Sequence, residues 1–173
     1  MAFDINNYLT EEKLETILVE VFGTVVRNKQ FKPYRFRPDF RLDQEKIVVE
    51  FNGPNHFCDP NIISSDYHKK ELIQSSGYQL IEIPYFVQLT REVTKFLFGI
   101  DGDYSFGFPH GFVNPKAETP SYFCIDGVIR YLKILKVFPN EVLEQCMESL
   151  DGTLGVPDYS EISVLLDELK EVL

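Results

Sequence analysis

Two acidic side chains, Asp39 and Glu50, have the spacing in this sequence that best suits metal chemistry. A turn centred between Gln44 and Glu45 would fold the chain into a hairpin with Asp39 directly opposite Glu50. Their Cβ atoms would then be roughly 4.5–5.5 Å apart. Two carboxylates at that separation repel each other unless a proton or a cation lies between them. Hard divalent cations such as Mg²⁺ bind such oxygen ligands, so the hairpin predicts a metal site.

The alternation of apolar and polar residues sets the register of this hairpin. Leu42 falls opposite Ile47 and Phe40 opposite Val49, and side chains alternate between faces along each strand. The apolar face then comprises Phe36, Phe40, Leu42, Ile47, Val49 and Phe51, and the polar face comprises Arg35, Arg37, Asp39, Arg41, Glu50 and Asn52. One register therefore gives a core face and places both carboxylates together on the other face.

Periodicity and stop signals predict the elements that position the hairpin. Apolar residues at helical spacing, with Thr10 as a cap and Gly23 as a stop, predict a helix over about 11–22. We also predict strands at 24–27, 34–42, 46–52 and 78–83, a loop at 53–64, a helix from Ser65 or Asp66 to about Ser76, and a helix at 90–98.

The chain is expected to form one α/β domain over residues 1–173, with a central mixed sheet flanked by helices. The core spans about 10–98, and a loop and helical part spans about 99–173. In that second part, a Gly-, Pro- and aromatic-rich loop is followed by helices at about 121–137, 140–150 and 159–172.

Composition indicates a cytoplasmic or nucleoid-associated protein rather than a secreted one. No stretch approaches the roughly 18 apolar residues that a membrane span needs, so we expect no membrane partner. The N-terminal residues lack the basic and apolar regions of a signal peptide. The three cysteines form no CxxC pair, which favours reduced thiols over zinc or disulfides.

The formal net charge of −10 hides a local basic strip. Over residues 27–41, six Lys and Arg face a single acid, Asp39. A local field matters more than the net charge for steering a polyanion into a cleft. We therefore take Arg35, Arg37 and Arg41 as candidate DNA-binding residues.

Pro38-Asp39, ten further residues and then Glu50-Phe51-Asn52 form a pattern that resembles the PD-(D/E)XK nuclease superfamily. The predicted α-β-β-β-α-β order also resembles the shared core of that superfamily, and the resemblance covers roughly residues 10–95. The segment EFNGPNH looks closest to the very-short-patch-repair branch. The resemblance implies a restriction-endonuclease-like fold with extra C-terminal helices.

The resemblance also implies roles for individual residues. Asp39 and Glu50 would bind Mg²⁺ or Mn²⁺, with the backbone carbonyl of Phe51 as a further ligand. An acid of the first helix belongs to the site in several such nucleases. Glu11 lies nearest the buried edge of that helix, and Glu15 is the second choice.

The superfamily's usual lysine, which orients or deprotonates the attacking water, falls at Asn52. Asparagine cannot act as a general base and carries no charge. Lys69, Lys70 or His56 could take its place, since a base needs only hydrogen-bond reach to the water.

These residues together predict a Mg²⁺-dependent DNA endonuclease of the restriction or repair and nicking type, acting alone, as a homodimer or with a partner subunit. An alternative is a catalytically silent protein of the same fold that binds DNA or a protein partner, which Asn52 and the acidic C-terminal part favour. A third alternative is a structural assembly protein, which would have no metal affinity.

Overall fold

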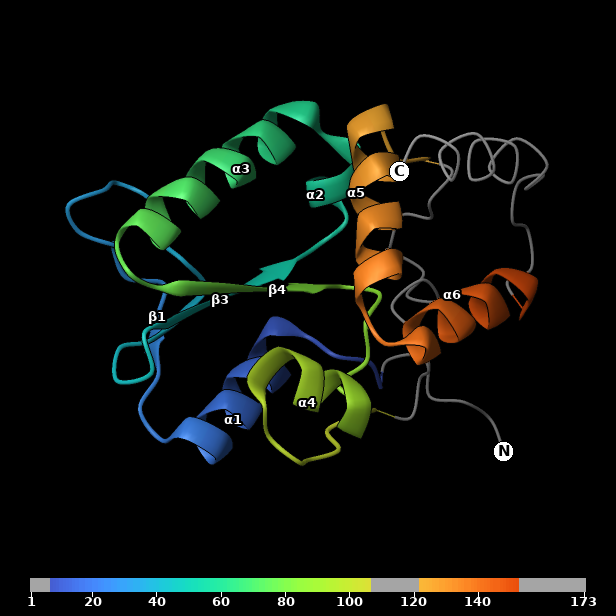
Figure 1. Cartoon of the computed structure of the whole chain (residues 1–173), viewed down its shortest axis with the longest axis horizontal. Coiled ribbons are helices and arrows are strands. Elements are labelled where there is room, and N and C mark those ends of the chain that lie inside the picture. Colours follow the sequence, from blue (N-terminus) through green and yellow to red (C-terminus); the bar gives the residue numbers. More distant parts are fainter. Residues whose placement is uncertain (1–6, 107–121, 153–173) are drawn as a thin grey trace.

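The sheet at the centre of the molecule has four strands in the order β1-β2-β3-β4. The computed structural model describes residues 7–106 and 122–152 (Figure 1). The strands are β1 (Val26–Arg27), β2 (Phe40–Leu42), β3 (Ile47–Asn52) and β4 (Gln79–Pro84). The first three strands pair antiparallel, and β4 pairs parallel with β3. The expected mixed sheet of an α/β protein is therefore present.

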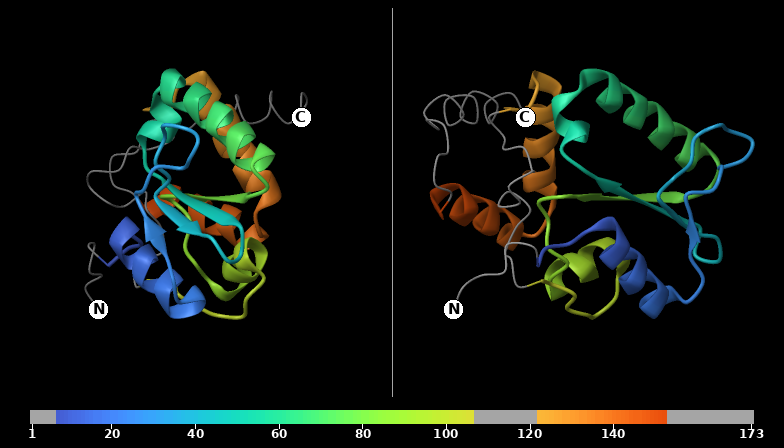
Figure 2. Two further views of the ribbon diagram at one scale, coloured as in Figure 1. Left: turned by 90° about the vertical axis from the view of Figure 1, so that its left-hand side faces the viewer. Right: turned by 180° about the vertical axis from the view of Figure 1, so that it is seen from behind.

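Helices cover both faces of this sheet. They are α1 (Glu11–Phe22), α2 (Asn55–Cys58), α3 (Pro60–Ser75), α4 (Arg91–Phe98), α5 (Ile125–Val137) and α6 (Asn140–Gly152). Helix α3 lies over one face, α1 and α4 lie over the other, and α5 runs beside α2 (Figures 1 and 2). Within the described residues, no helix is both long and apolar enough to cross a membrane.

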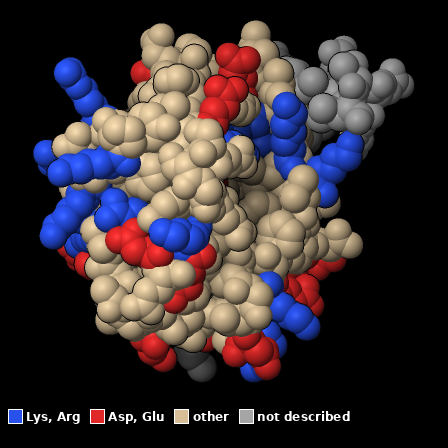
Figure 3. Space-filling model, turned by 60° about the vertical axis from the view of Figure 1, so that its left-hand side comes forward, with Lys and Arg blue, Asp and Glu red and all other residues tan. Residues whose placement is uncertain are grey.

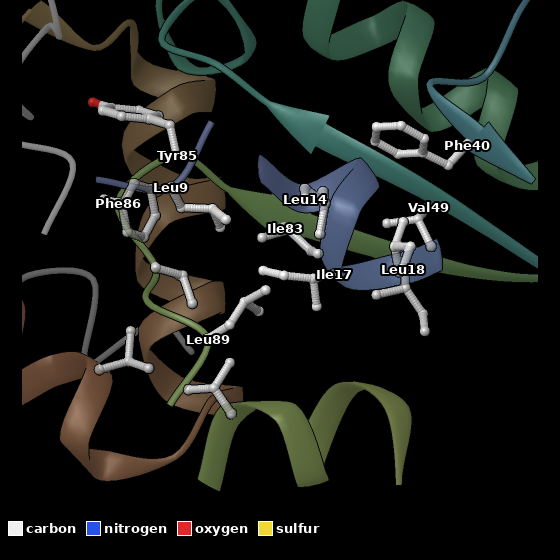
Figure 4. Packing of buried hydrophobic residues seen from close by; sticks show 14 of the residues in the cluster. Leu9, Leu14, Ile17, Leu18, Phe40, Val49, Ile83, Tyr85, Phe86 and Leu89 are labelled. Carbon is white, nitrogen blue, oxygen red and sulfur yellow. The ribbon is translucent and has the colours of Figure 1, made fainter. Parts of the chain in front are cut away.

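Helix α1 packs against one face of the sheet and contributes to the main core. The Thr10 side chain caps it by accepting a hydrogen bond from the Lys13 backbone N–H. Its apolar stripe buries Leu14 and Leu18 almost completely, in the cluster that also contains residues of β2, β3 and β4 (Figure 4). Each such side chain contributes roughly 1.5–3 kcal/mol by leaving water. This packing fixes which face of the hairpin is the core face.

The hairpin register is the predicted one, because Leu42 pairs with Ile47 and Phe40 pairs with Val49. Phe40 and Val49 are fully buried on the α1 side of the sheet. Phe36 is different: it packs with Phe31 and Val48 in a second cluster. The prediction for Phe36 was wrong because β2 begins only at Phe40, so the alternation of faces does not extend back to residue 36.

Three other predicted segments differ from the structure. Residues 53–64 were expected to be a loop, but they contain α2 and the start of α3. The cap of α3 is Asp59, which accepts from the Asn61 N–H at 2.8 Å, and Pro60 suits the first helical position because it needs no N–H partner there. The strands expected at 24–27 and 34–42 are shorter. The helix expected at 159–172 lies outside the described residues.

Helix α5 joins the core through a backbone contact with α2. A Cβ atom added at Gly127 would lie 1.7 Å from the Phe57 carbonyl oxygen. The Cys124 N–H donates to the same carbonyl at 3.1 Å. The start of α5 is thereby fixed beside the segment that carries His56.

Gly127→Ala should lower the free energy of unfolding by about 1–3 kcal/mol, because the new methyl group must push α5 off α2. At an open helical position the same change would stabilise by about 1 kcal/mol. Urea unfolding measures the difference, with Lys133→Ala on the exposed side of α5 as the control. An unchanged or more stable Gly127→Ala protein would contradict this close approach.

Candidate active site

Three carboxylates occupy neighbouring positions, with Asp39 directly before β2, Glu50 on β3 and Glu82 on β4. Glu50 and Glu82 are direct partners in the parallel β3–β4 pair. The pair Phe40–Val49 ends the β2–β3 ladder, and one step further along the antiparallel pair Asp39 falls opposite Glu50. Directly paired residues project from the same face, so the three acids lie on the sheet face beneath α3.

Asp39 is oriented by the backbone of β3. Its Oδ2 accepts a hydrogen bond from the Phe51 N–H at 2.8 Å. Burial raises the pKa of Asp39 and the Phe51 hydrogen bond lowers it, while the nearby charge of Glu11 raises it again; the net shift is upward. Asp39 is therefore less acidic than an ordinary aspartate and lies close to another acid.

Glu50 has no group in the described residues to compensate its charge fully. Its Oε1 is buried and has no hydrogen-bond partner there. Burial, and next the negative charge of Asp39, raise the pKa of Glu50 to about 8. A buried acceptor without a partner is costly, so this carboxyl group needs either a proton or a cation.

Helix α3 supplies the cations that face these acids. Asp66, Lys69, Lys70 and Ile73 have the spacing of one helical face. Lys69 lies 3.7 Å from Asp66, and its charge lowers the pKa of both Asp39 and Glu50. Glu50, Asp66, Lys69 and Glu82 line one small cavity between α3 and the sheet.

Lys70, by contrast, pairs with Glu82 at 3.5 Å, and 44% of its side chain is exposed. It does not line the cavity that Glu50 and Lys69 share. The two adjacent lysines of α3 are therefore not equivalent, and Lys69 is the one placed near the Asp39–Glu50 pair.

His56 and Asp66 form a hydrogen-bonded dyad. The His56 Nδ1 lies 2.6 Å from an Asp66 oxygen. Burial raises the pKa of Asp66, but hydrogen bonds from His56 and Arg130 outweigh it, so the net shift is downward. A carboxylate can only accept, so Nδ1 carries the proton, and in neutral imidazole the other nitrogen, Nε2, is then a proton acceptor. When the ring is protonated, the positive charge of His56 lowers the pKa of Asp39.

Arg130 of α5 links the acids from the far side of the site. It is 8% exposed. Its Nη1 donates to Asp66 at 2.7 Å and to the His56 carbonyl at 3.1 Å, and its Nη2 donates to Glu82 at 2.5 Å. One buried guanidinium thus fixes the dyad relative to β4.

Asn52 lies on the same face as Glu50 but does not point freely into the site. It is 2% exposed, and its amide nitrogen donates to Glu82 at 3.2 Å. The Asn52 side chain therefore orients Glu82.

The remaining candidates form no hydrogen bond with Asp39 or Glu50 among the described residues. Glu11 accepts from Arg27 at 3.1 Å, and its negative charge raises the pKa of Asp39. Arg35 and Arg37 are exposed. Arg41 forms two hydrogen bonds with Asp43, at 2.5 and 3.0 Å.

Sequence reasoning missed three residues of this site: Asp66 as a partner of histidine, Glu82 and Arg130. Glu82 carried a signal, because it is an acid between the apolar Ile81 and Ile83 on a strand that was correctly predicted. Arg130 carried none, since nothing in the sequence relates α5 to the hairpin.

The described residues contain no group of three or more His, Cys, Asp or Glu side chains arranged to hold a metal ion. A cation at this site would therefore have two carboxylates at most as side-chain ligands. Mg²⁺ accepts such sites, because it commonly binds one or two carboxylates and keeps several waters.

Three comparisons relate the chain to known proteins. The model of the RAP domain family matches residues 49–89, which include Glu50, His56, Asp66, Lys69 and Glu82 but neither Asp39 nor Arg130. The ribosomal RNA large subunit methyltransferase Cfr of Bacillus velezensis is 35% identical over 79 residues. The catalytic domain of the homing endonuclease I-Bth0305I has a TM-score of 0.35 and 22% identity.

These matches are partial. The family model covers less than half of the chain. The methyltransferase match covers 45% of this chain, and the chain spans only 22% of that protein. The endonuclease match covers 43% of this chain and 72% of that domain, and its TM-score is too low to support an argument about the fold.

Glu50→Gln should stabilise the protein increasingly as the pH rises, in the presence of a chelator. Folded Glu50 keeps its proton up to a pKa of about 8, whereas an unfolded glutamate loses it near 4.5. Between these values the folded state binds more protons, so the wild-type free energy of unfolding falls with rising pH. Glutamine escapes this loss.

The stability advantage of Glu50→Gln should grow by about 4 kcal/mol between pH 5 and pH 9, at about 1.4 kcal/mol per pKa unit. Urea unfolding of both proteins across this range measures it. A difference that does not change with pH would contradict the raised pKa.

Proposed function

We propose that this chain is a divalent-cation-dependent endonuclease of the PD-(D/E)XK type that hydrolyses phosphodiester bonds in DNA. The observation that carries the proposal is the Glu50 carboxyl group, which lies opposite Asp39 and beside Lys69 and whose buried Oε1 has no hydrogen-bond partner among the described residues. A purely structural role would not require an acid pair held at such electrostatic cost.

The donor set fits Mg²⁺ or Mn²⁺. Asp39 and Glu50 would hold the ion, with the Phe51 carbonyl oxygen as a further ligand, and the cation would satisfy the orphaned Glu50 Oε1. When bound, such an ion activates water and neutralises charge that develops on the scissile phosphate.

The surrounding side chains would each contribute one task. The Nε2 of His56 can accept the proton of the attacking water, because Asp66 fixes the proton of the ring on Nδ1. Lys69 supplies the positive charge that the superfamily's lysine would otherwise bring, from α3 instead of β3. These roles belong to residues that the sequence named as substitutes for Asn52.

Glu82 and Arg130 would act on the site indirectly. Arg130 orients Asp66, and Asn52 together with Arg130 orients Glu82. Substituted ligand and base positions need such support, because a catalytic group displaced by even 1 Å loses much of its effect.

The second candidate function is a catalytically silent nucleic-acid-binding protein. Asn52 favours it, because the amide is buried and bonded to Glu82 rather than available to a water molecule. RNA belongs among the substrates to be tested, since the matching methyltransferase is named for ribosomal RNA. The two functions differ in whether the wild type cleaves.

Binding of Mg²⁺ at pH 7 should release close to one proton, because the pKa of Glu50 is raised to about 8 and the cation must replace that proton. Calorimetry in buffers of different ionisation enthalpy measures the number released. The release should shrink above pH 9 and disappear in Glu50→Gln, whereas Glu12→Gln, an exposed acid of α1, should behave as the wild type. No heat of binding in any buffer would rule out the metal site.

Cleavage of supercoiled DNA with Mg²⁺ or Mn²⁺ should be abolished by chelator and by Asp39→Asn or Glu50→Gln. Lys69→Gln and His56→Gln should each lower the rate by about 10²–10⁴-fold, the usual range for lost acid–base catalysis. Their neighbours Lys70→Gln and His68→Gln are matched controls and should cleave nearly as well as the wild type. Equal rates in Lys69→Gln and Lys70→Gln would overturn the role of Lys69.

A wild type that binds Mg²⁺ with proton release but cuts neither DNA nor RNA would identify the silent protein. A wild type that cuts in the presence of chelator would contradict both candidates.

A further inference from the structure

A basic groove lies on the flank of the molecule formed by residues 28–37, the β2–β3 turn and the end of α3. Five cationic side chains line it: Lys29, Lys32, Arg37, Arg41 and Lys46. Asp43 is the one acid in the lining. Figure 3 brings this flank forward and shows Lys and Arg side chains gathered along its left side.

Most of this positive charge is uncompensated. Residues 28–37 contain four Lys and Arg and no acid, in a chain with a net charge of −10. Lys29, Lys32 and Arg37 are exposed and form no ion pair with any described residue. A concentration of one sign in a concave site focuses the field and attracts polyanions.

The wall opposite these three cations is held in place by a polar network. The Asp43 carboxylate accepts from Arg41 and, at 3.0 Å, from the Tyr78 hydroxyl. The Lys46 Nζ lies 4.9 Å from the centre of the Tyr78 ring. Asp43 thus orients Arg41 and Tyr78 supports Lys46, so the single acid serves to position the cations.

The segment 28–37 has a small apolar core of its own. Phe31 is 3% exposed and packs with Val48 and Ile73. The rings of Phe31, Tyr34 and Phe36 are nearly parallel, with centroids 5.4–6.1 Å apart. The exposed cations are therefore carried by an anchored segment, which lowers the entropy lost when a ligand orders them.

The groove is separate from the acid row formed by the neighbouring acids Asp39, Glu50 and Glu82. Lys46 lies in the turn directly before β3, four residues before Glu50, which corresponds to about 13 Å at roughly 3.3 Å per residue of strand. A polymeric anion that reaches from the groove to Glu50 would have to cover this length, which a chain of phosphates does and a single small anion does not.

We propose that this groove binds the sugar–phosphate backbone of the nucleic acid. The bound stretch would lie next to the stretch of the same polymer that reaches the acid row. The choice of a nucleic acid as the ligand rests on the proposed function. The inference adds that residues outside the acid row supply the binding energy. Phosphate contacts of this kind position a nucleic acid without reading its sequence.

Binding without cleavage tests the groove. Fluorescence anisotropy with labelled duplex DNA, single-stranded DNA and single-stranded RNA is measured in chelator, over about 50–200 mM salt. The groove variant is Lys29→Gln, Lys32→Gln and Arg37→Gln together. The control variant is Arg91→Gln, Lys95→Gln and Lys133→Gln, which removes the same charge from α4 and α5. Thermal unfolding verifies that both variants fold.

The groove variant should lose affinity for the preferred polymer, and the slope of log K against log salt should fall by about 2–3, near 0.9 per contact for duplex and 0.7 for single strands. The control should keep the wild-type slope. Comparison of the three polymers identifies which one the groove prefers. Equal slopes in the groove and control variants would overturn the proposal. So would displacement of the oligonucleotide by an acidic peptide of equal charge at equal concentration.

The outcome is independent of catalysis. Glu50→Gln should bind as tightly as the wild type in chelator. If binding depends on the groove but the protein cuts nothing, the groove proposal stands and the nuclease proposal fails. If the protein cuts and the groove variant binds as tightly as the wild type, the nuclease proposal stands and the groove proposal fails.

Discussion

The buried guanidinium of Arg130 is the interaction on which the arrangement between α3 and the sheet depends. Asp66 and Glu82 project into that space from different elements, and Arg130 donates to both. A buried charge without a partner is strongly destabilising, and Arg130 is the one described cation that contacts both Asp66 of α3 and Glu82 of β4. The backbone contact at Gly127 makes that delivery geometrically possible. Helix α5 thus contributes a side chain to the site, although the matched family segment ends at residue 89.

Compensation by Arg130 is unequal among the acids, and this inequality gives the site its character. Asp66 has partners in Arg130, His56 and Lys69, and its pKa is lowered. Glu50 has a neighbouring lysine charge, but its Oε1 has no hydrogen-bond partner in the part of the chain that the structure describes, and its pKa is raised. The same low-dielectric space therefore contains one carboxylate that stays ionised and one carboxyl group that needs a proton or a cation. Divergent acidities in adjacent acids are typical of sites that move protons.

Charge is segregated on a larger scale as well. An acid row in a molecule of net charge −10 would repel a phosphate polymer. The exposed cations of residues 28–37 lie on the flank of the same sheet, beyond the hairpin turn. The groove can attract a phosphate polymer while the acid row attracts a cation, because screening limits each field to about 8–10 Å in physiological salt. This separation explains how an acidic chain can be a candidate for nucleic-acid chemistry.

The sequence by itself determined the local parts of this arrangement. Period-two alternation fixed the register of β2 and β3, because a slip of one residue would expose Phe40 and Val49 to water. Capping and stop residues placed α1, a short helix was predicted where α4 lies, and the cation-rich composition of residues 28–37 was visible directly. Errors arose where a short-range signal was ambiguous: Asp59-Pro60 starts a helix that was read as loop.

Only the tertiary structure decided which distant residues complete the site. The parallel pairing of β3 and β4 places Glu82 beside Glu50, and strand pairing is set by packing across the whole sheet rather than by either strand. The tertiary structure also shows that Lys69 rather than Lys70 shares the cavity with Glu50. It shows as well that Asn52 is hydrogen-bonded to Glu82 and that Arg130 reaches the site from α5. Such partnerships depend on contacts between segments far apart in the chain. Local periodicity carries no information about them, because many different packings satisfy the same alternation of apolar and polar residues.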